Sequence, residues 1–186
     1  MKSILRRELK EILGNISEEE VSDKSATIAK TVSELDEFKS SSVIMIYLSI
    51  PGEVDTSAIA INAWAGAQTV VAPIACPDTR DMRPVVCPDG DVELLHPGHG
   101  LRQPANAHPV DIGEIDMVIV PALAFDDRCN RLGRGGGFYD RFLANPELDA
   151  VCVGVCFTEQ IVDELPINDY DRSVDIVVTD RSAYYA

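Results

Sequence analysis

Apolar residues follow two different periods along the chain, and the changes of period predict its elements. Spacing of three and four residues predicts helices over residues 2–13, 18–35, 56–65 and 138–143. Short runs rich in valine and isoleucine predict strands at residues 42–48, 69–73, 116–120, 150–156 and 175–179. Strands that alternate with helices favour a three-layer αβα fold of the α/β class, with a mostly parallel, Rossmann-like sheet and helices on both faces. The 186 residues predict a single domain over 1–186.

Three residues at predicted helix ends support these boundaries. Gly14 ends the first helix, and Ser17, followed by three glutamates, predicts a capping box for the second. Asp55 is predicted to cap the helix that begins at residue 56.

The stretch from residue 75 to residue 109 is rich in proline, glycine, aspartate and histidine. Met82–Val86 and Val92–Leu95 are predicted to form a small hairpin within it. Long loops in compact domains often have a function. The histidines of the chain lack a zinc-binding spacing and are interpreted as ordinary loop residues: His96, His99 and His108.

The charge balance limits the classes of partner. Sixteen basic and 31 acidic side chains give a net charge of −15, which argues against nucleic-acid binding. The acidity indicates a highly soluble surface or adaptation to a salty cytoplasm, and the first interpretation is favoured. An anionic small-molecule substrate would need a local basic pocket. No long apolar stretch opens the chain, so we expect neither a signal peptide nor a membrane partner.

Five cysteines without a Cys-x-x-Cys pair predict free thiols in a reducing cytoplasm. Cys152 and Cys156 alternate with valine in an apolar run and are interpreted as core residues. Cys129 lies in a polar turn, and its role stays open.

The densest chemical signal follows the predicted strand 116–120. Residues 133–137 contain four glycines interrupted only by Arg134, and a predicted helix follows. Glycine lets backbone N–H groups approach an anion closely, and a helix N-terminus adds a partial positive charge. Arg131, Arg134 and Arg141 add full charges, so the segment favours phosphate binding. A flexible turn with solvated arginines is the alternative, and neither a Walker loop nor a dinucleotide fingerprint is present.

Phe125-Asp126 and residues 130–140, Asn-Arg-Leu-Gly-Arg-Gly-Gly-Gly-Phe-Tyr-Asp, resemble the signature of the 5-formyltetrahydrofolate cyclo-ligase family. Tyr47–Thr56 resembles a second family segment, and the likeness runs from Lys2 to Thr179. It implies a three-layer α/β fold and an ATP- and Mg²⁺-dependent conversion of 5-formyltetrahydrofolate to 5,10-methenyltetrahydrofolate, with release of ADP and phosphate. It also implies a cytoplasmic enzyme acting on ATP and a reduced folate, which we expect to be a monomer or homodimer.

The resemblance assigns a role to each matching position. Magnesium would be held by Asp140 and Asp171, and catalysis would involve Arg131, Arg134 and Tyr139. The residues implied to bind ATP are Lys2, Arg6, Arg131, Leu132, Gly133, Arg134, Gly135, Gly136, Gly137, Phe138 and Tyr139. The residues implied to bind the folate are Leu48, Glu53, Arg134, Gly135, Gly136, Gly137 and Phe138. Met82-Arg83-Pro84-Val85 resembles a Met-rich family segment that would help to cover the folate.

The residues alone leave other interpretations open. Lys2 and Arg6, four apart on one helical face, would otherwise be a solvated basic edge. Asp171 would be a turn residue, and Asp140 would be an acid in the first turn of a helix.

Three positions depart from the family pattern. Gln103 stands where a glutamate is usual, Cys129 where a glycine is usual, and Gly136 where many members carry lysine. These departures leave room for a paralogue that keeps the ATP site and uses a different substrate. Two other classes remain: a folate or nucleotide binder without ATP turnover, and a plain nucleotide-binding domain with no dependence on Glu53.

Overall fold

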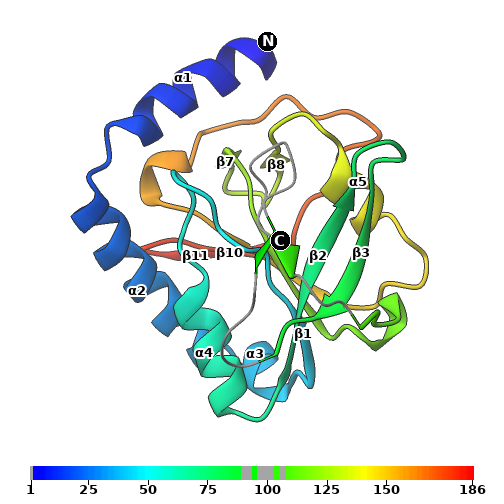
Figure 1. Ribbon diagram of the computed structural model, residues 1–186. Helices are drawn as coiled ribbons and strands as arrows, with labels where there is room; N and C mark the ends of the chain where they lie inside the picture. The colour runs from blue at the N-terminus through cyan, green and yellow to red at the C-terminus, as the bar shows by residue number, and fades with distance from the viewer. Residues whose placement is uncertain (1, 89–93, 96–102, 105–107) are drawn as a thin grey trace.

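The computed structural model describes residues 2–88, 94–95, 103–104 and 108–186, built around a seven-stranded sheet (Figure 1). The spatial strand order is β11-β10-β9-β6-β1-β2-β3. The five inner strands are parallel, whereas β3 and β11 pair antiparallel at the two edges. The strands are β1 (Val43–Met45), β2 (Thr69–Cys76), β3 (Asp81–Val86), β6 (Met117–Val120), β9 (Val151–Val155), β10 (Ile176–Val178) and β11 (Ala183–Tyr185).

Helices cover both faces of this sheet, as the sequence predicts. The larger core cluster joins one sheet face to helices α1 (Lys2–Gly14), α2 (Glu18–Glu34), α3 (Asp36–Ser40) and α4 (Ser57–Ala65). The second cluster joins the other face to the short helix α5 (Phe138–Leu143) and the 3₁₀ turn η1 (Ile112–Glu114). Figure 1 shows α1, α2 and α4 on one side of the sheet and α5 on the other. The three-layer α/β prediction is confirmed, and the helical layer that contains α5 and η1 is much thinner than the layer of α1 to α4.

The predicted helix boundaries agree closely with the structure. Ser17 and Glu20 form the capping box of α2, each side chain accepting a hydrogen bond from the other residue's backbone N–H. Thr56, not Asp55, occupies the N-cap of α4. Asp55 still stabilises the first turn, because its Oδ1 accepts a 2.9 Å hydrogen bond from the backbone N–H of Ser57.

The hairpin predicted within residues 75–109 is wrong in its pairing. Met82–Val86 lies in β3, which pairs with β2 from Val71↔Val86 to Cys76↔Asp81 and extends the main sheet. The physical reason is that β2 continues to Cys76, so a tight turn returns the chain along its open edge. Strand β4 (Leu94–Leu95) instead pairs with β5 (Gln103–Pro104). His96 and His99 lie outside the described residues, and His108 is exposed.

Several short elements escaped the sequence analysis. They include the hairpin of β7 (Ala124–Phe125) with β8 (Arg131–Leu132), the edge strand β11, helix α3, and the 3₁₀ turns η1 and η2 (Thr158–Gln160). Over the parts of the chain that the structure describes, no helix combines the length and apolar character needed to cross a bilayer.

Candidate ligand-binding site

A cavity of about 360 Å³ lies beside the loops that follow β1 and β6, with further residues from β2 and β3 in its wall. Ligands of open α/β sheets bind at such carboxyl ends of strands. The cavity brings together the residues to which the resemblance assigned ATP, folate, magnesium or a catalytic role: Lys2, Arg6, Leu48, Glu53, Arg131, Leu132, Gly133, Arg134, Gly135, Gly136, Gly137, Phe138, Tyr139, Asp140 and Asp171. Arg141, the third arginine of the glycine-rich segment, does not line it and donates instead to the carbonyl of Thr79.

The glycine loop, residues 133–137, forms one wall. Gly135 has φ +107° and Gly137 has φ +73°, conformations that residues with a Cβ rarely adopt. The backbone N–H groups of the loop donate no hydrogen bond to another described residue. Helix α5 has only six residues, so these N–H groups, more than a helix dipole, are the groups of this wall that could donate to an anion.

Asp126, fully buried, shapes the turn that leads into this wall. Its carboxylate accepts hydrogen bonds from the backbone N–H groups of Arg128, Asn130 and Leu165. Cys129 lies within the turn at φ +59°, which explains why a glycine suits this position. Its thiol is buried, and burial raises its pKa, so Cys129 is a structural residue rather than a nucleophile at neutral pH.

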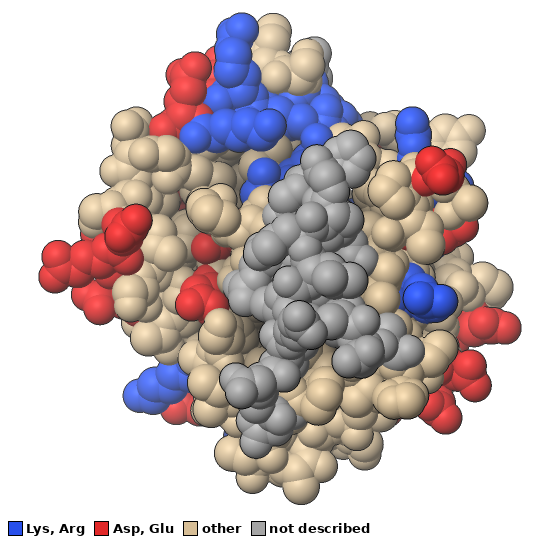
Figure 2. Space-filling view, in the orientation of Figure 1, with Lys and Arg blue, Asp and Glu red and all other residues tan. Residues whose placement is uncertain are grey.

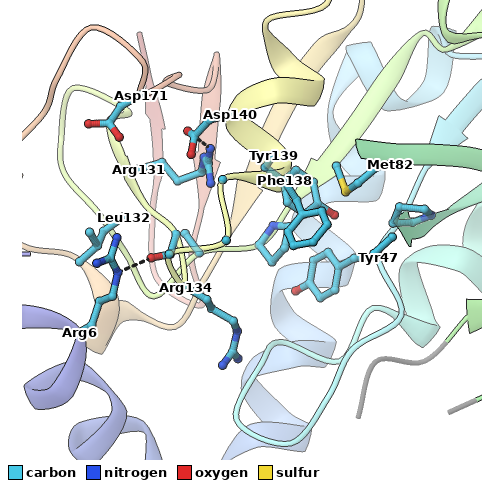
Figure 3. A pocket seen from close by; sticks show the side chains of 18 of the residues that line it. Arg6, Tyr47, Met82, Arg131, Leu132, Arg134, Phe138, Tyr139, Asp140 and Asp171 are labelled. Atoms are coloured by element: carbon cyan, nitrogen blue, oxygen red, sulfur yellow. Dashed lines mark hydrogen bonds and ion pairs between the residues drawn. The ribbon is translucent and has the colours of Figure 1, made fainter. Parts of the chain in front are cut away.

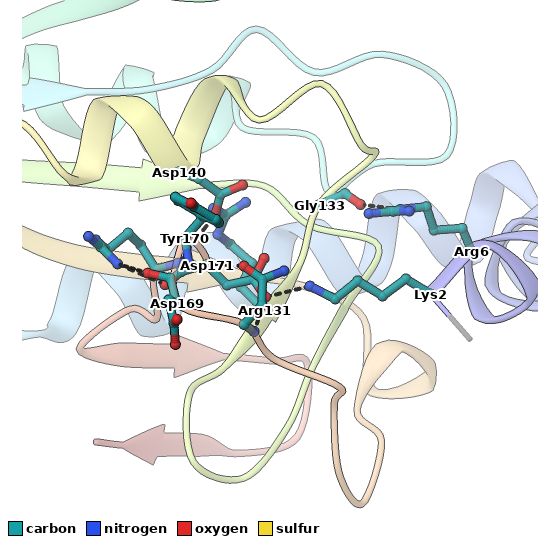
Figure 4. A network of polar contacts seen from close by, with 10 residues as sticks. Lys2, Arg6, Arg131, Gly133, Asp140, Asp169, Tyr170 and Asp171 are labelled. Atoms are coloured by element: carbon teal, nitrogen blue, oxygen red, sulfur yellow. Dashed lines mark hydrogen bonds and ion pairs between the residues drawn. The ribbon is translucent and has the colours of Figure 1, made fainter.

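The charged end of the cavity consists of Lys2, Arg6, Arg131, Asp140 and Asp171 (Figure 4). Lys2 forms an ion pair with Asp171, and the Nε of Arg6 donates to the carbonyl of Gly133 at 2.9 Å. A terminal nitrogen of Arg131 lies 2.5 Å from Oδ1 of Asp140. These contacts attach the first turns of α1 to the glycine loop and to the segment around Asp171.

Arg131 is the most enclosed of these cations, with a side chain only 3% exposed. Burial lowers its pKa, an effect that the neighbouring Asp140 opposes. Its Nε is buried and has no hydrogen-bond partner among the described residues. An unsatisfied buried donor is costly, so an anionic ligand that accepts from it would relieve a real penalty.

Asp140 and Asp171 each keep one carboxylate oxygen available. Oδ1 of Asp140 and Oδ2 of Asp171 accept the protein's hydrogen bonds, whereas the second oxygen of each accepts none from a described residue. Among the residues that the structure describes, no group of three or more metal-ligating side chains occurs. Two carboxylates fit magnesium nonetheless, because this ion commonly takes its remaining ligands from water and phosphate.

The aromatic end of the cavity consists of Tyr47, Met82, Phe138 and Tyr139 (Figure 3). The hydroxyl of Tyr47 donates to the carbonyl of Val54 at 3.1 Å and holds the loop that follows β1. The hydroxyl of Tyr139 is buried without a partner among the described residues. Burial and the charge of Glu53 raise the pKa of Tyr139, so its hydroxyl stays a neutral donor.

Glu53 and Arg134 form an ion pair between the charged end and the aromatic end of the cavity. Oε1 of Glu53 accepts from Nε of Arg134 at 2.9 Å and from a terminal nitrogen at 2.8 Å. Oε2 of Glu53 accepts a 3.2 Å hydrogen bond from the backbone N–H of Ile50. The pair therefore joins the glycine loop to the β1 loop, residues 49–56.

The sequence analysis missed part of the cavity lining, although most of the missed residues lie at or just after the carboxyl ends of predicted strands. Pro121 and Ala122 directly follow β6, and Ala75 lies on the part of β2 beyond its predicted end. The rule that ligands bind at carboxyl ends of strands could have identified them. The lining residues without a predicted role are Tyr47, Ile50, Pro73, Ala75, Pro121, Ala122 and Asn168.

A mostly parallel sheet with a basic, glycine-rich cavity beside its strand ends defines an α/β protein suited to an anionic small molecule. The model of the 5-formyltetrahydrofolate cyclo-ligase family matches residues 1–180. The chain belongs to this family. It is 30% identical to a probable 5-formyltetrahydrofolate cyclo-ligase of Caenorhabditis elegans, over 96% of this chain and 92% of that protein. It is 29% identical to the mouse 5-formyltetrahydrofolate cyclo-ligase, over 96% of this chain and 93% of that protein.

Solved structures support the same relationship. The chain superimposes on Aquifex aeolicus 5,10-methenyltetrahydrofolate synthetase with a TM-score of 0.84 at 28% identity, covering 99% of this chain and 92% of that one. A 5,10-methenyltetrahydrofolate synthetase from Mycoplasma pneumoniae shares the fold, with a TM-score of 0.78 at 20% identity over 97% of this chain and 99% of that one.

Proposed function

We propose that the protein is a 5-formyltetrahydrofolate cyclo-ligase, which converts 5-formyltetrahydrofolate and ATP to 5,10-methenyltetrahydrofolate, ADP and phosphate. The observation that carries the proposal is one cavity with a charged end and an aromatic end, joined by the Glu53–Arg134 ion pair. Such a cavity can hold a polyphosphate and a flat heterocycle side by side. Family membership supplies the identity of the two ligands.

ATP would bind at the charged end. The unused N–H groups of residues 133–137 would cradle its phosphates, and Lys2, Arg6, Arg131 and Arg134 would neutralise their charge. Leu132, Phe138 and Tyr139 would complete the ATP contacts as lining residues. The unsatisfied Nε of Arg131 gives this end a donor that no described residue uses.

The pterin ring of the folate would lie against the aromatic end. Leu48 and Phe138 would contact its faces, together with the backbone of Gly135 to Gly137. A pterin presents a ring N–H beside an amino group, and one carboxylate accepts from both. Glu53 is the acidic residue in the cavity wall on the β1 loop, and it would take this role once Arg134 releases its Oε1.

The reaction needs positioning and charge neutralisation more than a protein nucleophile. The formyl oxygen attacks the γ-phosphorus of ATP, the bond from that phosphorus to the bridging oxygen breaks, and ADP leaves. The second folate nitrogen then attacks the activated carbon, the ring closes, phosphate departs and the nitrogen loses its proton. Arg131 and Arg134 would stabilise the transferring phosphoryl group, and the Tyr139 hydroxyl would donate to whichever ligand reaches it.

Asp140 and Asp171 would hold Mg²⁺ through their available oxygens. When bound, magnesium supplies charge neutralisation on the phosphates. The protein's own contribution is to present two carboxylates fixed by hydrogen bonds from the backbone N–H groups of Arg172 and Asn168. The proposed cofactor set is therefore Mg²⁺, with ATP as co-substrate.

Near-ultraviolet absorbance tests the proposal directly, because methenyltetrahydrofolate absorbs where 5-formyltetrahydrofolate does not. We expect the signal to grow only when ATP and magnesium are both present. A folded protein that binds ATP but gives a flat trace would contradict the proposed substrate and favour the paralogue. We also propose that the protein acts in the cytoplasm as a single domain, monomeric or homodimeric, in keeping with its five free cysteines.

A further inference from the structure

The Glu53–Arg134 ion pair occupies the groups that both proposed ligands need. Arg134 lies on the glycine loop and Glu53 on the β1 loop, 81 positions apart in sequence. Figure 3 shows the Arg134 side chain leaving the glycine loop toward the cyan loop after β1. Two nitrogens of Arg134 bind the same Glu53 oxygen, and Ile50 binds the other oxygen. Without ligand, the carboxylate is therefore already hydrogen-bonded through both oxygens.

The two partners differ in how freely they can move. The Glu53 side chain is 11% exposed and is restrained by the Ile50 N–H, whereas the Arg134 side chain is 42% exposed. The loop that carries Arg134 contains two glycines at positive φ. Opening the pair therefore means that the arginine leaves and the glutamate stays.

A bound polyphosphate would favour this movement. It offers Arg134 several negative charges in place of one, and the N–H groups of the same loop would hold the phosphates nearby. Once Arg134 leaves, Oε1 of Glu53 needs a new donor, because an unpaired, nearly buried carboxylate is costly. The paired N–H groups of a pterin would supply that donor.

We propose that Arg134 exchanges partners between Glu53 and the nucleotide phosphates, so that each substrate promotes binding of the other. This inference rests on the proposed function and adds an energetic link between nucleotide binding at the charged end and folate binding at the aromatic end. The link is reciprocal, as any coupling between binding equilibria must be. Whichever ligand binds first opens the ion pair, and the second ligand finds its partner already free.

Calorimetric binding of 5-formyltetrahydrofolate, with and without a saturating non-hydrolysable ATP analogue and magnesium, tests the coupling. We expect the analogue to lower the folate Kd of the unsubstituted protein roughly fivefold. In Arg134→Met the analogue should leave the folate Kd unchanged. In the same variant the folate alone should bind at least as tightly as to the unsubstituted protein, because Glu53 is free from the start. A direct contact of Arg134 with the folate predicts weaker binding instead.

Arg128→Met is the matched control, because Arg128 is an exposed arginine between the two parts of the signature and does not line the cavity. It should keep the coupling of the unsubstituted protein. Coupling that persists in Arg134→Met, or folate binding that weakens in it, overturns the inference. A protein that binds both ligands and forms product without coupling overturns only the inference. A protein that binds no folate overturns the proposed function and the inference with it.

Discussion

The two ends of the cavity are constructed differently. The charged end depends on contacts between distant segments, such as Lys2 with Asp171, and most of these side chains are one-fifth to one-quarter exposed. At the aromatic end, Tyr47 and Met82 are buried and Phe138 and Tyr139 pack against a core cluster. The side chains of the charged end can therefore exchange partners without disturbing the core, whereas the packing of the sheet sets the shape of the aromatic end.

Arg131→Met should have the largest effect on turnover, because the Arg131 side chain is buried and lines the charged end of the cavity. Removing one preorganised donor to developing charge lowers turnover by about 100- to 1000-fold. Steady-state kinetics should show this loss, with folate affinity changed much less. Arg131→Lys, which keeps the charge but not the planar fork, should recover only part of the rate.

Circular dichroism melting is the control for Arg131→Met, since the variant leaves Asp140 without its ion-pair partner. A folded variant with unchanged turnover would remove Arg131 from the catalytic site. Equal losses of nucleotide and folate affinity would break the distinction between the two ends.

Glu53→Gln should weaken folate binding by about 10- to 100-fold, the range for a hydrogen bond to a charged group. Nucleotide binding should not weaken, because Arg134 no longer has to leave a carboxylate. Titration of each ligand separately measures both effects. Similar losses for the two ligands would contradict the assignment of Glu53 to the pterin.

Gly136→Ala tests the shape of the aromatic end. A Cβ at this position would lie 2.7 Å from Cδ2 of Phe138, so the ring must move out of its place in the cavity wall. We expect roughly tenfold weaker folate binding, in line with the cost of overpacking, and a smaller effect on nucleotide binding. Gly14→Ala is the matched control, because a Cβ there meets nothing within 4 Å. Unchanged folate affinity in Gly136→Ala would show that Phe138 does not shape the folate site.

Gly136 also shows what sequence reasoning could and could not provide. The glycine run and the resemblance identified residues that the structure brings to one cavity, because local chemistry and chain order record them. The spacing of Lys2 and Arg6 alone favoured a solvated edge, and only the resemblance placed the two residues in a site. The contact between Gly136 and Phe138 depends on a rotamer two residues away, which no pattern of apolar positions encodes. Any side chain at position 136, lysine included, would therefore collide with the Phe138 ring in this structure, which the sequence alone did not reveal.

The same limit applied to the fold. The strands of the parallel sheet were predicted because each is a contiguous apolar run, whereas the β3 pairing was not. That pairing depends on where β2 ends, and strand ends follow tertiary contacts more than local sequence. The ion pairs of the cavity were also unpredicted, since their partners lie up to 169 positions apart.

Lys2→Met should give the smallest effect and tests how the charged end works. Its ion pair with Asp171 is partly exposed, with side chains 24% and 20% accessible, so water and salt screen it. We expect about threefold weaker binding of the ATP analogue at low ionic strength, and a smaller difference at high salt, because screening removes the contribution of an exposed charge first. Isothermal titration at two salt concentrations measures this. A salt-independent loss would mean that Lys2 acts by fixing helix α1 in place, and the charged end would then resemble the aromatic end in depending on packing.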